Sequence, residues 1–221
     1  MPNHMPPKQL SFPAPRTWGG RRKGAGRKRV SPRPNVPHTR RPTHAQAHPI
    51  HVTLRRHGDF PSLRNPRIFR VLKSAFQKST KSNFRVIHFS VQSDHIHLVA
   101  ESENRVVLAR GIQGLAVRIA RNVNKLVGRR GRVFGDRYHA RDLRTPREVR
   151  NAIAYVLLNR AKHDPRSPGG GDFFSSGAWF DGWSVEIRRS DEPSPVARAR
   201  TWLAGTGWRR CGLVRSDERP G

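Results

Sequence analysis

The chain has 221 residues and a formal net charge of +29, with 44 lysines and arginines against 15 acidic residues. Self-repulsion on this scale works against a compact state, so we expect an anionic partner, nucleic acid ahead of a membrane surface. The sequence holds no apolar run long enough to span a membrane, and its single cysteine, Cys211, excludes an internal disulfide framework and a cysteine-based zinc cluster. With no apolar leader apparent, we expect a cytoplasmic, nucleoid-associated protein and no membrane partner.

Composition divides the chain into three parts. Residues 1–47 are rich in proline, arginine and glycine and bury too little apolar surface to offset chain entropy, which predicts a disordered basic arm. Residues 48–164 carry the periodic patterns of a folded domain, and residues 165–221 form a glycine-rich linker with an aromatic-rich extension. The densest cations of the arm are candidates for DNA contact: Arg21, Arg22, Lys23, Arg27, Lys28 and Arg29. A solvated charge run is an equally good interpretation of the arm.

The first half of the domain predicts three strands and a helix. Alternating apolar residues predict a strand over 48–56, and Asn65-Pro66 is typical of a helix start. A second strand is expected over 84–92, with Ile87, Phe89 and Val91 on one face. A tight turn at Ser93-Asp94 then leads into a third strand, so the two strands form a hairpin.

A long amphipathic helix is predicted from Val106 to Val127. Its apolar stripe repeats at steps of four and three: Leu108, Ile112, Leu115, Ile119, Val123 and Leu126. Arg118, Arg121 and Lys125 lie away from the stripe and are candidates for DNA binding, although an ordinary solvated face has the same pattern. Gly128 is available to end the helix with a positive φ.

Residues 132–143 predict a loop or a fourth strand, and a last helix begins at a capping box, Thr145 to Glu148. The order strand, helix, strand, strand, helix, strand, helix predicts an α+β fold. We expect a ferredoxin-like (RRM-like) βαββαβ sandwich with an additional C-terminal helix that carries a tyrosine, flanked by basic tails.

His95 and His97 begin the third predicted strand. Side chains two apart on a strand point to the same face, so these two imidazoles can reach one metal ion while Ile96, Leu98 and Ala100 fill the core face. Two histidines that simply line a half-buried sheet would show the same three-residue pattern, so the pair alone does not decide between the two interpretations.

Tyr155 and Asn159 stand four residues apart on the last predicted helix, one turn above each other on the flank of its core face. A phenolate near a two-histidine metal site could attack a phosphodiester, and the Asn159 amide oxygen could complete the coordination. Imidazole and oxygen ligands together suit Mg²⁺ or Mn²⁺. The alternative is a tyrosine packed at the edge of the core.

These residues carry a resemblance to a known family. The segment Asp94-His-Ile-His-Leu98 resembles the HUH motif of single-tyrosine transposases, and Tyr155-Val-Leu-Leu-Asn159 is similar to their tyrosine helix, in the order found in the REP-associated tyrosine transposases. The resemblance covers about residues 48–163. It implies a metal-dependent endonuclease and strand transferase acting on single-stranded or hairpin DNA. Tyr155 would form the 5′-phosphotyrosine link, and His95, His97 and Asn159 would hold the metal. Arg160 stands where the family often has proline.

Two further points stay open in the sequence. The composition is equally compatible with a non-catalytic or domesticated nucleic-acid-binding protein that has an RRM-like fold. Such a protein would be expected to expose aromatic residues on its central strands. The aromatic residues of the extension favour docking of the tail on the domain over stacking on DNA bases, and a short helix is expected over 195–203. Monomer and homodimer are equally compatible with the sequence.

Overall fold

The computed structural model describes residues 42–163 and 172–219. The six arm cations proposed for DNA contact, from Arg21 to Arg29, and the glycine-rich linker lie outside the described residues. Among the described helices, none is long and apolar enough to cross a membrane.

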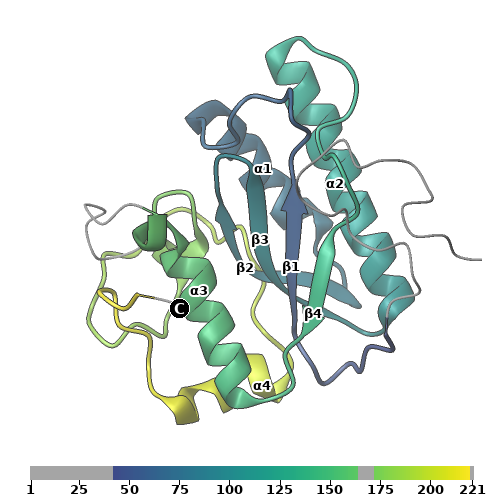
Figure 1. Ribbon diagram of the computed structural model, residues 1–221. Coiled ribbons are helices and arrows are strands. Elements are labelled where there is room, and N and C mark those ends of the chain that lie inside the picture. The colour runs from purple at the N-terminus through teal and green to yellow at the C-terminus, as the bar shows by residue number, and fades with distance from the viewer. Residues whose placement is uncertain (1–41, 164–171, 220–221) are drawn as a thin grey trace, which may run out of the picture. The chain divides into compact units, whose positions relative to one another are not determined.

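A four-stranded antiparallel sheet organises the domain (Figure 1). Its strands are β1 (Ile50–Arg55), β2 (Phe84–Val91), β3 (His95–Ser102) and β4 (His139–Asp142), in the spatial order β2-β3-β1-β4. The helices α1 (Pro66–Ser79), α2 (Arg105–Val127) and α3 (Pro146–His163) fall between and after the strands, so the predicted order of elements is confirmed. The mixed α and β architecture is as expected, and the ferredoxin-like label remains a prediction.

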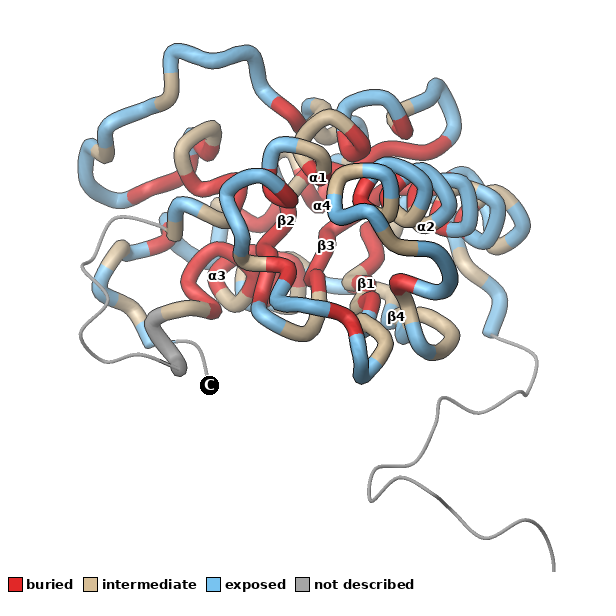
Figure 2. The backbone as a smooth tube through the Cα atoms, turned by 90° about the horizontal axis from the view of Figure 1, so that it is seen from above, coloured by how far each residue is buried: buried red, intermediate tan, exposed pale blue. Residues whose placement is uncertain are grey.

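The sheet separates two apolar cores. Ile96, Leu98 and Ala100 of β3 pack on one face with the buried sides of α1 and α2, which we call the α1/α2 face. Val99 of β3 packs on the other face with α3 and the C-terminal extension, and we call this the α3 face. Figure 2 shows the buried residues gathered in the strands, while the outer side of α2 is exposed. Because side chains alternate along a strand, β3 contributes to both cores.

The helix ends follow their sequence signals. The Asn65 side chain accepts hydrogen bonds from two backbone N–H groups at the start of α1, and Gly128 ends α2 with φ 67°. The capping box of α3 is confirmed in both directions, since the Glu148 N–H donates to Thr145 Oγ1 and the Thr145 N–H donates to Glu148 Oε2. Leu126, at the end of the predicted α2 stripe, is only partly buried.

The predicted face of β2 is partly wrong. The pairing of β2 with β3 shifts between Val86 and His88, so a bulge interrupts the alternation. Phe89 and Val91 belong to the core on the α1/α2 face, whereas Ile87 belongs to the core on the α3 face. One extra residue in a strand moves the following side chains to the opposite face, and sequence alternation alone did not reveal it.

The extension covers the outer edge of β2 and the back of α3. The backbone N–H of Val91 donates to Phe174 O, Ser90 bridges to Ser175, and Ala197 N–H donates to Val86 O. These contacts satisfy an edge strand that would otherwise expose its hydrogen-bonding groups. Segments far apart in the sequence therefore lie side by side, as Figure 1 shows for the yellow chain next to α3.

Three aromatic side chains of the extension are buried against α3, which confirms docking of the tail for these residues: Phe180, Trp183 and Trp208. The fit is close at Gly182, where a Cβ would lie 2.3 Å from the Trp208 ring. Phe173 and Trp202, in contrast, are 70% and 54% exposed.

The helix expected over 195–203 is displaced toward the C-terminus. The helical pieces are α4 (Trp202–Gly205) and the 3-10 helix η2 (Gly207–Cys211), after an earlier 3-10 turn η1 (Ser176–Trp179). Residues around 197 instead run along β2, and Thr201 is the N-cap of α4, with its side chain accepting from Ala204 N–H.

Candidate functional site

Two neighbouring strands bring histidines together on the α3 face. In the antiparallel pairing of β1 with β3, Thr53 stands opposite His97 and His51 stands opposite Val99. His51 and Thr53 share one face of β1 because they are two residues apart. The face of the sheet beneath α3 therefore holds His95, His97, His51 and Thr53 in one group.

The two predicted metal ligands converge on each other. His95 Nε2 lies 2.8 Å from His97 Nε2, and the ring planes are nearly perpendicular, at 84°. At this distance one nitrogen must carry a proton that the other accepts. On the far side of the His95 ring, Nδ1 lies 2.6 Å from Asp94 Oδ1, so the carboxylate accepts the Nδ1 proton. The two Nε2 atoms therefore lie next to each other, on the side of the His95 ring away from Asp94.

Burial keeps the inner histidines neutral. Burial first, and then the neighbouring histidines and Arg55, lower the pKa of His97 to about 2. Burial first, and then the Coulombic influence of His139 and Arg141, lower the pKa of His51 to about 4. At Asp94 burial is the largest single influence and acts to raise the pKa, but the hydrogen bond with His95 and the Coulombic interactions with His95 and Arg55 together outweigh it, so the pKa is lowered overall. Neutral imidazoles next to an ionised carboxylate are the protonation states that metal ligands require.

Tyr155 faces these histidines from α3. Its ring centroid lies 5.1 Å from that of His97 and 5.8 Å from that of His51, in edge-to-face arrangements. The tyrosine ring therefore packs directly on the two imidazoles. Its burial is intermediate, so the side chain is not enclosed in the core.

Asn159 lies deeper than its sequence position suggested. The flank of the core face was predicted, but the residue is fully buried, and neither its amide nitrogen nor its oxygen has a hydrogen-bond partner among the described residues. The start of α3 lies near the Ile50 end of β1, because Leu143 N–H donates to Pro49 O. Since Tyr155 then reaches His97, α3 runs toward the end of the sheet that carries His95. Asn159, one turn beyond Tyr155, continues in that direction.

The donor set fits a divalent cation. Two imidazole nitrogens bound to one ion at about 2.1 Å and at a right angle would be about 3.0 Å apart, close to the 2.8 Å between the two Nε2 atoms. Leaving a buried amide without partners costs free energy, which a ligand would recover. Within the described residues no group of three or more His, Cys, Asp or Glu side chains forms a metal cage.

The predicted DNA-binding cations of α2 are not part of this group. Arg118, Arg121 and Lys125 are exposed, and the buried side of α2 packs on the α1/α2 face of the sheet. The three cations therefore lie across the sheet from the histidines. The α2 helix contains no acidic residue that would neutralise them.

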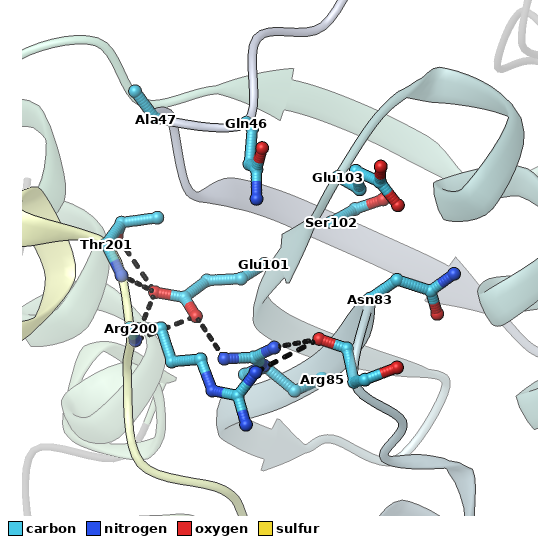
Figure 3. A pocket seen from close by; sticks show the side chains of 10 residues that line it. Gln46, Ala47, Asn83, Arg85, Glu101, Ser102, Glu103, Arg200 and Thr201 are labelled. Atoms are coloured by element: carbon cyan, nitrogen blue, oxygen red, sulfur yellow. Dashed lines mark hydrogen bonds and ion pairs between the residues drawn. The ribbon is translucent and has the colours of Figure 1, made fainter.

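A cavity of about 650 Å³ lies at the opposite end of β3 from His95 (Figure 3). Its wall holds the buried Glu101, which accepts hydrogen bonds from the backbone N–H groups of Arg200 and Thr201 and forms an ion pair with Arg85 at 3.6 Å. Figure 3 shows the carboxylate pointing at the extension and the Arg85 guanidinium at once. This cluster fastens the extension to β3 and lies away from the tyrosine.

His51 and Thr53 are site residues that sequence reasoning missed. The alternation of 50–55 placed both on one face of a strand, but nothing in that pattern shows which strand pairs with it. The register of β1 against β3 decides that they meet His97.

Comparison with known proteins gives one family and one similar fold. Residues 43–156, more than half of the chain, match the family described as Transposase IS200 like. Among solved structures, a REP-associated tyrosine transposase bound to a REP hairpin is similar at 15% sequence identity and a TM-score of 0.48, covering 58% of this chain and 74% of that chain. No curated protein matches the sequence. The family match contains His95, His97 and Tyr155 and ends before Asn159.

Proposed function

Because this chain belongs to the family of IS200-like transposases, we propose that it cleaves and rejoins single-stranded DNA through Tyr155. The observation that carries the proposal is the contact of the Tyr155 ring with His97, 5.1 Å between centroids, beside two imidazole nitrogens that lie 2.8 Å apart. His95, His97 and Asn159 would hold Mg²⁺ or Mn²⁺, and the substrate would be a single strand or a strand next to a hairpin.

In this mechanism the Tyr155 oxygen attacks a backbone phosphorus in line with the leaving oxygen. The bond from the tyrosine oxygen to phosphorus forms as the bond from phosphorus to the 3′ oxygen breaks. The phenol loses its proton and the departing 3′ oxygen takes one up. The product is a 5′-phosphotyrosine and a free 3′-hydroxyl, and attack by a 3′-hydroxyl on the phosphotyrosine reverses the exchange. A bound divalent ion supplies positive charge to the phosphate oxygens.

The surrounding residues of the chain orient these groups. Asp94 fixes the ring of His95 through Nδ1, so that Nε2 would be the nitrogen that holds a bound ion. The helix α3 presents Tyr155 and Asn159 one turn apart, and the packing of Trp208 and Trp183 behind α3 holds that helix against the sheet. Rigid support of this kind keeps the nucleophile in a reactive position.

The test is covalent capture of DNA. The protein is incubated with 5′- and 3′-labelled single strands that carry a hairpin, together with Mn²⁺, and the adduct that resists SDS is measured. We expect the adduct with the wild-type chain and none with Tyr155→Phe, which removes one oxygen and leaves the ring contacts in place. Tyr138→Phe is the matched control, since Tyr138 is the other tyrosine of the chain, and it should retain the adduct. DNA binding without an adduct in the wild-type chain would favour the non-catalytic alternative.

A further inference from the structure

The two histidines of the pair differ in what holds their outer nitrogens. Nδ1 of His95 faces the carboxylate of Asp94 at 2.6 Å. The described neighbours of His97 Nδ1 are instead His51 Nε2, at 3.2 Å, and Thr53 Oγ1, at 3.1 Å. A neutral histidine binds a cation through the nitrogen that carries no proton, so His97 needs its proton on Nδ1 and an acceptor there.

His51 has the geometry of that acceptor. The ring centroids of His51 and His97 are 5.2 Å apart while the facing nitrogens are 3.2 Å apart, and the planes differ by 29°. The two nitrogens therefore point at each other along the line that joins the rings, so an N–H in the plane of one ring reaches the lone pair of the other. An imidazole nitrogen is also a stronger acceptor than a hydroxyl oxygen, which Thr53 offers at a similar distance.

We infer that His51 is a positioning residue that accepts the Nδ1 proton of His97 and thereby directs the His97 Nε2 lone pair toward the metal ion. The inference rests on the proposed function, since it needs His97 to be a ligand. It assigns a role to a residue of β1, far from the Asp94-His-Ile-His97 segment in sequence. His51 also packs edge-to-face on Tyr155, so a purely structural role as a packing residue is the competing explanation.

Three substitutions separate the two roles. His51→Phe keeps an aromatic ring against His97 and Tyr155 but removes the acceptor. His51→Gln loses the ring but offers an amide oxygen near the position of Nε2. Thr53→Val removes the competing hydroxyl in a side chain of the same shape. If His51 is the acceptor, the Phe variant is defective, the Gln variant is rescued and the Val variant is close to wild type. If His51 acts only through packing, the Phe variant is close to wild type and the Gln variant is defective.

The primary measurement is Mn²⁺ affinity of the full chain without DNA, followed by the EPR signal of free Mn²⁺ during titration. We expect His51→Phe to weaken affinity by about 10- to 100-fold, the usual effect of losing a hydrogen-bond partner of a metal ligand. His51→Gln and Thr53→Val should stay within about threefold of wild type. If His51→Phe does not fold, as judged by thermal unfolding, His51→Val removes the acceptor in a good strand former and carries the same expectation.

A second measurement reads the proton position directly. In metal-free protein with ¹⁵N-labelled histidine, the ring shifts of His97 should show the tautomer that is protonated on Nδ1, and the population of this tautomer should fall in His51→Phe. Wild-type Mn²⁺ affinity in His51→Phe, or a defect in Thr53→Val instead, would overturn the inference while leaving the metal site intact. Failure of the wild-type chain to bind Mn²⁺ would overturn the proposed metal site itself, so the two failures are distinguishable.

Discussion

Asn159 brings two polar atoms into a fully buried position on α3, and within residues 42–163 and 172–219 neither has a hydrogen-bond partner. A buried polar group without partners costs about 1–3 kcal/mol. Sites of this kind are found where a ligand supplies the missing interaction. Asn159 is therefore the position where stability and metal binding should respond in opposite directions to one substitution.

We predict that Asn159→Leu leaves the thermal stability of the metal-free protein unchanged or raises it, because an apolar side chain of similar size carries no unpaired polar group. The same variant should lose most of its Mn²⁺ affinity, and Asn159→Asp should retain it, since it keeps an oxygen ligand. Calorimetric unfolding and Mn²⁺ titration measure the two effects. A destabilised Asn159→Leu that binds Mn²⁺ normally would show that the amide is structural.

At the scale of elements, α3 depends on the extension behind it. The extension closes the edge of β2, packs Trp208 and Trp183 against α3, and is fastened to β3 through Glu101. Arg64 and Asp172 add a bidentate ion pair, with N···O distances of 2.5 and 2.7 Å, at the first described residue of the extension. The helix that carries Tyr155 is thus held between the sheet and a segment added after the domain.

We predict that Glu101→Gln loosens this attachment. The change leaves the buried Arg85 without its counter-charge and replaces an acceptor of the Arg200 and Thr201 N–H groups, which should destabilise the protein by about 3 kcal/mol. Hydrogen exchange should quicken first at the amides of Thr201 and Ala197. Glu103→Gln is the matched control, because Glu103 lines the same cavity, has the same charge and is exposed. Equal exchange in the two variants would contradict the role of Glu101.

At the scale of the whole molecule, the charge of +29 is spread unevenly along the chain. The helices α1 and α2 contain several basic residues and no acidic residue, and the arm before residue 30 contains a dense basic run. Such a distribution favours binding to a polyanion at many phosphates, and the strength of that binding falls as salt competes for them.

We predict that removal of residues 1–29 weakens DNA binding and makes its salt dependence shallower. For single-stranded DNA, the slope of log K against log salt concentration should become shallower by about 0.7 for each phosphate that the arm neutralises in the full chain. Adduct formation at saturating DNA should persist, since the proposed chemistry lies on β1, β3 and α3. The control replaces the same residues by a neutral glycine-serine segment of equal length. An unchanged slope in both variants would assign the arm to a different partner, and loss of the adduct at saturation would give it a part in the active site.

Local patterns determined much of this protein from the sequence alone. The order of elements, the caps at Asn65, Thr145 and Gly128, and the shared face of His95 and His97 all follow from interactions within a few residues, which a sequence displays directly. The histidine pair, Tyr155 and the family resemblance were therefore visible before the structure.

The tertiary structure decided what depends on residues distant in the chain. The register of β1 against β3 brought His51 and Thr53 to His97, and the bulge in β2 moved Ile87 to the other core. The depth of Asn159 follows from how α3 is packed between the sheet and the extension, which its helical spacing could not reveal. Strand register and helix packing are set by the sum of many long-range interactions, so no local pattern encodes them.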